Sequence, residues 1–223
     1  MHNVSFPSIL YFGTPVILIT TVNEDESFNI APISSVFWLG WRCMIGIAAS
    51  SKTTENLLRT KECVINLPSE NEVDKVNRLA LKTGSSPVPA SKKAKGYQYE
   101  PDKFGAAGFT SLPSSTVNAP RILECPVHLE AGVVAKHFLS KDEPLQYGNI
   151  ICFELKILQV HLDESIVDDD KPDHIDPDKW RPLIMSFQKF YGLGSQLHHS
   201  TLSEIPEKLY NTVDRKNALE MIQ

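Results

Sequence analysis

Residues 14–68 read TPVILITTVNEDESFNIAPISSVFWLGWRCMIGIAASSKTTENLLRTKECVINLP, and this stretch decides the fold. Short apolar runs rich in β-branched residues alternate with polar segments, which is the pattern of strands joined by turns. Four runs have this strand character: residues 15–22, 28–36, 41–49 and 62–67. The first run is almost continuously apolar, so we expect that strand to be buried on both faces. The polar turn at residues 23–27 predicts that the second strand returns antiparallel to it.

A helix is expected between the third and fourth strands, over residues 51–61. Ser51 can cap it, Glu55 lies in its first turns, and Leu57 faces inward. The first N–H groups of a helix have no partners within the helix and carry a partial positive charge. With the hydroxyls of Ser50, Ser51 and Thr53, the Lys52 ammonium, and Asn56 one turn on, this helix start has the composition of an anion site. An ordinary capped helix is the alternative interpretation.

The rest of the chain adds long strands and few helices. Apolar spacing predicts a helix over residues 71–81, and strands begin near Val127 and Ile151. The alternation in the second of these strands slips by one residue near Ile157–Leu158, which predicts a β-bulge. Residues 82–120 are expected to lack regular structure and to wrap a partner subunit or frame a ligand. We expect an acidic loop over residues 163–178 and a helix over residues 206–222.

These elements predict a mainly β fold, an antiparallel β-barrel with peripheral helices. The expected domain spans residues 1–200, and residues 201–223 form a helical extension of the same domain. The role of that extension is left open, as is the role of the acidic loop.

Composition narrows the partners and the compartment. The 223 residues carry a net charge of −5 with no basic stripe, which argues against nucleic acid. No apolar run approaches the roughly 20 residues of a membrane helix, and no signal peptide is evident. The four cysteines form no Cys-x-x-Cys pair, so buried reduced thiols are expected. The prediction is a cytoplasmic protein.

The second polar segment lies where the 28–36 run ends. Asn29-Ile30-Ala31-Pro32-Ile33-Ser34-Ser35 combines small side chains with a proline that removes a backbone donor. Backbone groups left open there could bond a flat heteroaromatic ring. The alternative is an edge bulge without chemical importance.

Together, these segments resemble the flavin reductase-like proteins, which bind FMN in a split β-barrel and include flavoredoxin-like members. The resemblance covers about residues 10–195. The matching segments are Pro15-Val16, Asn29–Ser35, Ser51-Lys52-Thr53 with Asn56, Glu62–Pro68, Ala119–Cys125 and Tyr191–Gly194.

The resemblance implies FMN at a homodimer interface, with the ring on Asn29–Ser35 and the phosphate at the helix start. Lys103, Arg121 and Tyr191 are further candidates, for a site contributed partly across the dimer. The cofactor-binding residues expected are Asn29, Ala31, Pro32, Ile33, Ser34, Ser35, Ser50, Ser51, Lys52, Thr53, Asn56, Lys103, Arg121 and Tyr191.

The activity implied is hydride transfer from NADH or NADPH to flavin, and then to free flavin, dioxygen or another small acceptor. Flavin carries this chemistry itself, so no catalytic side chain is required. The first alternative is an FMN-holding electron carrier reduced by a partner protein, and a barrel that has lost its cofactor is the second. The residues do not distinguish FMN from FAD, or NADH from NADPH, and they do not identify the acceptor.

Three other classes fit the sequence poorly. A nicotinamide-binding Rossmann domain needs a third glycine where Leu197 follows Gly192-Leu193-Gly194. No metal site is expected, because the adjacent His198 and His199 would diverge on a helix and the acidic loop lacks the glycine and glutamate of a calcium loop. A serine hydrolase lacks its Gly-x-Ser-x-Gly elbow.

Overall fold

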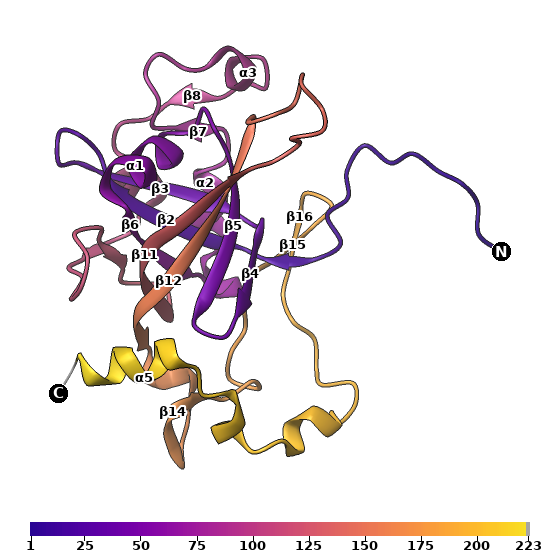
Figure 1. Cartoon of the computed structure of the whole chain (residues 1–223), viewed down its shortest axis with the longest axis vertical. Helices are drawn as coiled ribbons and strands as arrows, with labels where there is room; N and C mark the ends of the chain where they lie inside the picture. Colours follow the sequence, from indigo (N-terminus) through magenta and orange to yellow (C-terminus); the bar gives the residue numbers. More distant parts are fainter. Residues whose placement is uncertain (222–223) are drawn as a thin grey trace.

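The structure is a computed structural model that describes residues 1–221. Its centre is a seven-stranded antiparallel sheet in the order β3-β2-β6-β11-β12-β5-β4 (Figure 1). The strands are β2 (Ile17–Val22), β3 (Phe28–Ile33), β4 (Val36–Leu39), β5 (Arg42–Ala48), β6 (Glu62–Leu67), β11 (Val127–Phe138) and β12 (Ile150–Leu162). The mainly β class is therefore confirmed.

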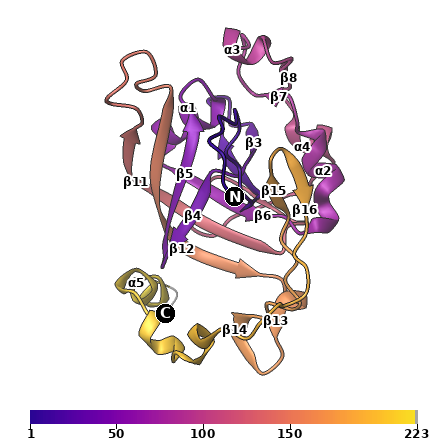
Figure 2. The ribbon, with the colours of Figure 1, turned by 90° about the vertical axis from the view of Figure 1, so that its right-hand side faces the viewer.

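The sheet curls because its two outermost strands are consecutive in the chain. Only Ser34 and Ser35 separate β3 from β4, although these strands lie at opposite ends of the strand order. Gly46 N donates to Ser35 O at 2.9 Å, but β3 and β4 are not paired. The result is a barrel left open between β3 and β4 (Figure 2). The predicted strand 28–36 is thus two strands, since Pro32 has no donor and Ser34-Ser35 lie outside the ladder.

Strand β2 is buried on both faces, as its sequence predicts. Ile17 and Ile19 point into the core inside the curled sheet. Leu18 points the other way, into a second core with Ile30 and Leu79. The outer face of this half of the sheet is therefore covered by the helices and connections that follow β6.

The bulge predicted near Ile157–Leu158 is present. Glu130 of β11 lies opposite Gln159, while the next residue, Ala131, lies opposite Ile157, so Leu158 is the extra residue. A second register shift follows between Val133 and Ala135. Such bulges increase strand bending and twist, which this curled sheet requires.

Short elements replace the long unstructured connection that was expected over residues 82–120, which is a correction. Helix α1 (Lys52–Thr60) matches its prediction, while a 3₁₀ turn (Glu70–Glu72) and α2 (Val73–Arg78) occupy most of the second predicted helix. The connection then contains β7 (Lys82–Thr83), α3 (Ala90–Lys93), β8 (Gln98–Tyr99), α4 (Lys103–Ala107) and β9 (Ser111–Leu112). Elements this short carry little periodicity in sequence, and their packing on the sheet stabilises them.

The C-terminal third also differs from its prediction. The expected acidic loop contains the hairpin β13 (Val167–Asp168) and β14 (Lys171–Ile175), while β15 (Ile184–Ser186) and β16 (Lys189–Tyr191) pair beside β1 (Thr14–Pro15). The predicted helix over 206–222 divides into a 3₁₀ turn (Glu207–Tyr210) and α5 (Val213–Glu220). Its last predicted residue, Ile222, lies outside the described residues. Across residues 1–221, every helix is too short or too polar to cross a membrane.

Candidate functional site

The start of α1 is built as the sequence indicates. Ser51 has extended backbone angles, and its side-chain oxygen accepts from Thr54 N at 3.0 Å, which caps the helix. Thr54 Oγ1 donates to Ala48 O at 2.8 Å and so fixes the helix start to the end of β5. Ser51, Lys52 and Thr53 line a cavity of about 220 Å³ in front of this helix start. We call it the polar cavity.

The polar cavity also contains the predicted strand-end residues. Ala31, Pro32 and Ile33 of β3 form one wall of the polar cavity. A smaller hollow of about 160 Å³ adjoins this wall, shares Pro32 and Ile33 with the cavity, and adds Ser34. We call it the apolar hollow, because Val16, Val76, Met185 and Phe190 form much of its lining. A polar space and an apolar one therefore lie along one strand end.

Asn29, Thr53 and Asn56 serve as buried links between β2, β3 and α1. Asn29 Nδ2 donates to Thr53 Oγ1 at 3.0 Å, and Asn56 Nδ2 donates to Thr21 Oγ1 at 2.9 Å and to Asn23 Oδ1 at 2.8 Å. Asn29 and Asn56 are buried and do not line the polar cavity. These amides hold the helix start in position, and only Thr53 of the three reaches the cavity surface.

Lys52 is already paired with acidic side chains. Its ammonium lies 2.6 Å from Glu24 Oε2 and 3.1 Å from Glu55 Oε1. Burial opposes protonation, but hydrogen bonds to these two carboxylates raise the pKa of Lys52 above its ordinary value. The same contact with Lys52 lowers the pKa of Glu24 to about 2. Much of the Lys52 charge is therefore balanced within the protein.

Lys103 reaches the polar cavity from the N-terminus of α4. Its Nζ donates to Asn29 Oδ1 at 3.0 Å and to Ile30 O at 2.9 Å, and the residue is 5% exposed. Both partners are neutral. Burial, together with the nearby charge of Lys92, lowers the pKa of Lys103 to about 7. Lys103 was a minor candidate in the sequence, and the structure puts its side chain in the lining of the cavity.

Sequence reasoning missed several lining residues from the connection after β6. Lys92, which is no candidate in the sequence, donates from Nζ to Thr83 Oγ1 at 3.1 Å inside the polar cavity. Gly84 packs so closely that an added Cβ would lie 2.7 Å from Asn29 Oδ1. Helix α3 has only four residues, so its sequence shows no periodicity from which the direction of the Lys92 side chain could be predicted. Gly84, within a Gly-Ser-Ser-Pro segment, was the available hint of a close backbone approach.

The remaining predicted residues lie elsewhere in this subunit. Ser50 is exposed, and Ser35 forms a 2.8 Å hydrogen bond with the Tyr11 hydroxyl. Tyr191 lies on β16, about half exposed, and pairs with Ile184. None of these three lines the polar cavity or the apolar hollow.

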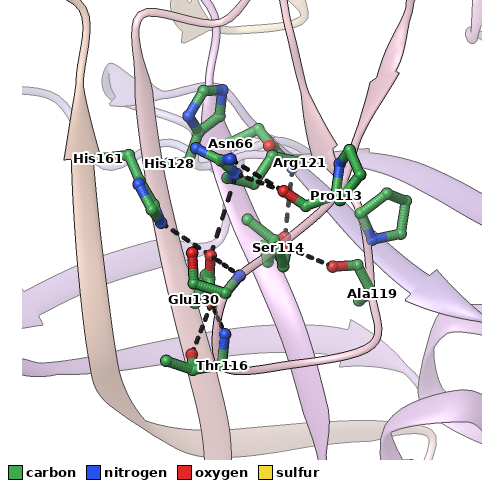
Figure 3. Close-up of polar contacts among 12 residues, drawn as sticks. Asn66, Pro113, Ser114, Thr116, Ala119, Arg121, His128, Glu130 and His161 are labelled. Atoms are coloured by element: carbon green, nitrogen blue, oxygen red, sulfur yellow. Dashed lines mark hydrogen bonds and ion pairs between the residues drawn. The ribbon is translucent and has the colours of Figure 1, made fainter. Parts of the chain in front are cut away.

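Arg121 belongs to a different cluster, shown in Figure 3. Its Nε and one terminal nitrogen donate to Pro113 O at 3.1 and 2.9 Å, and its Nε lies 4.0 Å from Glu130 Oε1. Glu130 accepts in turn from Ser115 N at 2.9 Å and from His161 Nε2 at 2.8 Å. The structure does not bring Arg121 to the polar cavity of its own subunit.

The other chemistries considered find little support in the geometry. Within residues 1–221, no group of three or more His, Cys, Asp or Glu residues is arranged around a common point that could hold a metal. All four cysteines are free, and burial raises the pKa of Cys43 to about 12. A thiol with such a pKa is a poor nucleophile at neutral pH.

The fold and the cavities together define a split-barrel protein with a polar cavity and an apolar hollow at the end of β3. The profile of the flavin reductase like domain matches residues 9–194, and the chain belongs to this family. A relative described as uncharacterized protein YdfE, from Bacillus subtilis (strain 168), is 40% identical over 198 residues, which cover 89% of this chain and 92% of that one.

Solved structures share the fold at lower identity. Flavoredoxin of Desulfovibrio vulgaris (Miyazaki F) matches with a TM-score of 0.72 and 21% identity, over 92% of this chain and 100% of that chain. The 2-nitrobenzoate 2-nitroreductase NbaA of Pseudomonas fluorescens matches with a TM-score of 0.68 and 18% identity, over 89% of each chain. At these identities the two structures establish the fold, which is the split barrel expected from the sequence.

Proposed function

We propose that this protein binds FMN along the end of β3 and acts as an oxidoreductase that accepts hydride from NADH or NADPH. One observation carries the proposal. The capped start of α1 and the buried amine of Lys103 face a single polar cavity, which shares Pro32 and Ile33 with the apolar hollow. Membership of the flavin reductase like family supports the same assignment.

The residues present fit the phosphate end of a mononucleotide. Thr53 and Ser51 offer hydroxyls at a helix start whose N–H groups favour anions. Lys103 is a buried amine bonded to neutral acceptors only, so an anion in the cavity would supply the opposite charge that its surroundings lack. Gly84 leaves the space beside Asn29 that any larger residue would fill.

The ring end of FMN would lie against Pro32, Ile33 and Ser34. This part of β3 presents a backbone that the proline partly frees from strand pairing, beside the apolar side chains of Met185 and Phe190. FMN, when bound, supplies hydride acceptance and electron transfer. The task of the protein is to hold the ring and leave one face open to the nicotinamide, and the open side of the barrel allows this.

We also propose that a second copy of the chain completes the site. The polar cavity, about 220 Å³, is smaller than the roughly 300–1,000 Å³ of most ligand pockets. The N-terminal segment extends away from the barrel in Figure 1, with Phe6 91% and Phe12 75% exposed. Large apolar side chains exposed along one segment are typical of interaction surfaces. Light scattering after size exclusion should give twice the 24.9 kDa of one chain. A flavin-loaded monomer would rule out the shared site.

An absorption spectrum tests the proposal most directly. The purified protein, or the protein after addition of FMN and desalting, should show the visible absorption of bound flavin. Anaerobic addition of NADPH or NADH should then bleach it. A protein that stays colourless after incubation with FMN would overturn the assignment. FAD and riboflavin, tested in parallel, identify which flavin the site prefers.

The second candidate function is an electron carrier that holds FMN and is reduced by a partner protein. It is favoured by the match to flavoredoxin, which extends over the whole of that chain. Stopped-flow reduction separates the two functions. Rapid bleaching by a nicotinamide cofactor supports the oxidoreductase, whereas bleaching that requires a separate reductase supports the carrier.

A further inference from the structure

The lysines that line the polar cavity differ in what balances their charge. Lys52 contacts two carboxylates within 3.1 Å. Lys82 lies 4.0 Å from Glu100 Oε2. Lys103, the most buried, bonds only the Asn29 amide oxygen and the Ile30 carbonyl. In the described part of the chain, no ion pair joins Lys103 to a carboxylate. The same holds for Lys92, which is less buried and donates to Thr83 Oγ1 at 3.1 Å.

The two hydrogen bonds of Lys103 fit a neutral amine. A neutral amine has two N–H groups, and two acceptors, Asn29 Oδ1 and Ile30 O, lie at 3.0 and 2.9 Å. A protonated amine has three donors. The third donor has no recorded protein acceptor, and the side chain that carries it lines the polar cavity.

The charged neighbours of Lys103 come from several elements. Lys92 of α3 opposes protonation, and Glu100, which follows β8, favours it. Tyr97 and Lys52 line the same cavity. Arg78 of α2 contacts the far end of α4 at Ala107 O.

The remaining contacts of Lys103 add no further charge, so burial has the largest effect on its pKa. Strand β3 contributes only neutral groups, and α4 itself begins after Asp102, which caps it through Gly105 N. Burial is the largest influence and holds the pKa of Lys103 near 7 in the absence of a ligand.

We propose that Lys103 takes up a proton from solvent when a phosphate monoester enters the polar cavity, so that ligand binding and proton binding are coupled. The neutral amine becomes an ammonium, its third N–H donates to a phosphate oxygen, and no bond in the ligand breaks. The dianion supplies the counter-charge that the protein does not. The inference rests on the proposed function in one respect, which is that FMN is the ligand.

Calorimetry in two buffers with different ionisation enthalpies measures the coupling. At about pH 8 a group with a pKa near 7 is mostly neutral, so FMN binding should take up about 0.9 proton per site. Because the second pKa of a phosphate monoester is near 6, the ligand itself is already a dianion at this pH. Above about pH 7, FMN affinity should fall by up to about tenfold per pH unit. Riboflavin, which lacks the phosphate, should bind without proton uptake.

Substitutions of Lys103 test whether this residue is the group that takes up the proton when FMN binds. Lys103→Met should abolish the uptake and flatten the pH dependence of FMN affinity. Lys93→Met is the matched control, because Lys93 is exposed on α3 and the substitution removes the same charge. Should Lys103→Met fail to fold, Lys103→Arg serves in its place, since its guanidinium stays protonated and any binding should proceed without uptake.

The outcomes separate this inference from the proposed function. FMN binding without proton uptake, uptake that persists in the Lys103 variants, or equal uptake with riboflavin would each overturn the inference while leaving FMN binding intact. If FMN does not bind, the proposed function fails, and inorganic phosphate becomes the probe. Phosphate that binds with uptake lost in Lys103→Met then supports the coupling, whereas phosphate that binds without uptake, or does not bind, overturns it.

Discussion

Two buried polar clusters lie on the same curled sheet, and they differ in how completely their charges are satisfied. In the Glu130 cluster (Figure 3), a carboxylate with 0% exposure accepts from Ser115 N, from Thr116 and from His161. In the Lys103 cluster, a buried amine meets only neutral acceptors. The first cluster is closed and ties residues 113–121 to β11, while in the second the protonated amine would have one donor more than it has acceptors. This incomplete satisfaction supports the proposed ligand site at the polar cavity.

Breaking the closed cluster should have the largest effect. Burial raises the pKa of Glu130, but hydrogen bonds from Thr116 and Ser115 outweigh this effect and hold the pKa below its ordinary value. Glu130→Ala removes the buried acceptor that Ser115 N, Thr116 and His161 share, so we expect a loss of about 3 kcal/mol in unfolding free energy. Urea unfolding measures it, with the exposed Glu220→Ala as control. A loss no larger than the control's would show that the cluster is not closed.

Asn29 should be next in size. Asn29→Ala removes a donor from Thr53 and an acceptor from Lys103, at an expected cost of about 2 kcal/mol of stability. Asn29→Asp is nearly isosteric and puts a carboxylate beside the lysine, so it should raise the pKa of Lys103 and weaken FMN binding. If Asn29→Asp binds FMN as well as the wild type does, the absence of a carboxylate beside Lys103 has no bearing on ligand binding.

The unliganded protein should also show the titration of Lys103. Its folded pKa, about 7, lies below the unfolded value of 10.5, so the unfolded state binds more protons between these two values. Stability relative to Lys103→Met should therefore rise with pH in this window, by up to about 1.4 kcal/mol per pH unit. Denaturant unfolding at several pH values measures the slope. Parallel curves for the two proteins would contradict it.

The helix start should contribute less. Ser51→Ala removes the cap of α1, for which we expect a loss of about 1 kcal/mol. Ser50→Ala is the matched control, because Ser50 is exposed. FMN affinity should also fall in the Ser51 variant alone. Equal effects of both substitutions would mean that the hydroxyl at the helix start has no special role.

The smallest change in stability is expected for Lys52. Its partners Glu24 and Glu55 are largely exposed, and such ion pairs contribute about 0–1 kcal/mol. FMN affinity should also fall less in Lys52→Met than in Lys103→Met, because Glu24 and Glu55 already balance the charge of Lys52. The reverse order, measured by fluorescence titration, would restore Lys52 as the main cation of the site.

Strand and helix identity in the first half of the chain followed closely from local pattern. The continuous apolar run of β2, the cap at Ser51 and the slipped alternation at Leu158 each have a direct counterpart in the structure. The break between β3 and β4 was not predicted, because apolar residues resume at Val36 directly after the two small serines, Ser34 and Ser35. The connection after β6 was missed for another reason. Its elements are two to five residues long, and they depend on contacts with the sheet.

The sequence predicted several residues that line the polar cavity, but it did not predict how the lysine charges there are balanced. Ser51, Lys52, Thr53 and the Ala31–Ile33 segment do meet at one cavity. Their linear order could not show that Asn56 turns toward Thr21, or that Arg121 turns toward Pro113. The proposed roles of Asn56 and Arg121 at a site shared with a partner subunit stay predictions.

The amino-acid sequence by itself determined where the long strands of the main sheet lie, where the first helix begins, and to which family the chain belongs. These features depend on periodicity, capping and motif spacing, which are local. Only the tertiary structure decided how the charges of Lys52 and Lys103 are balanced, since Glu24, Glu55 and Lys52 meet across 31 residues whereas Lys103 approaches Asn29 across 74. The charge that a cavity offers to a ligand is the sum over side chains that folding brings together, and no local pattern contains that sum.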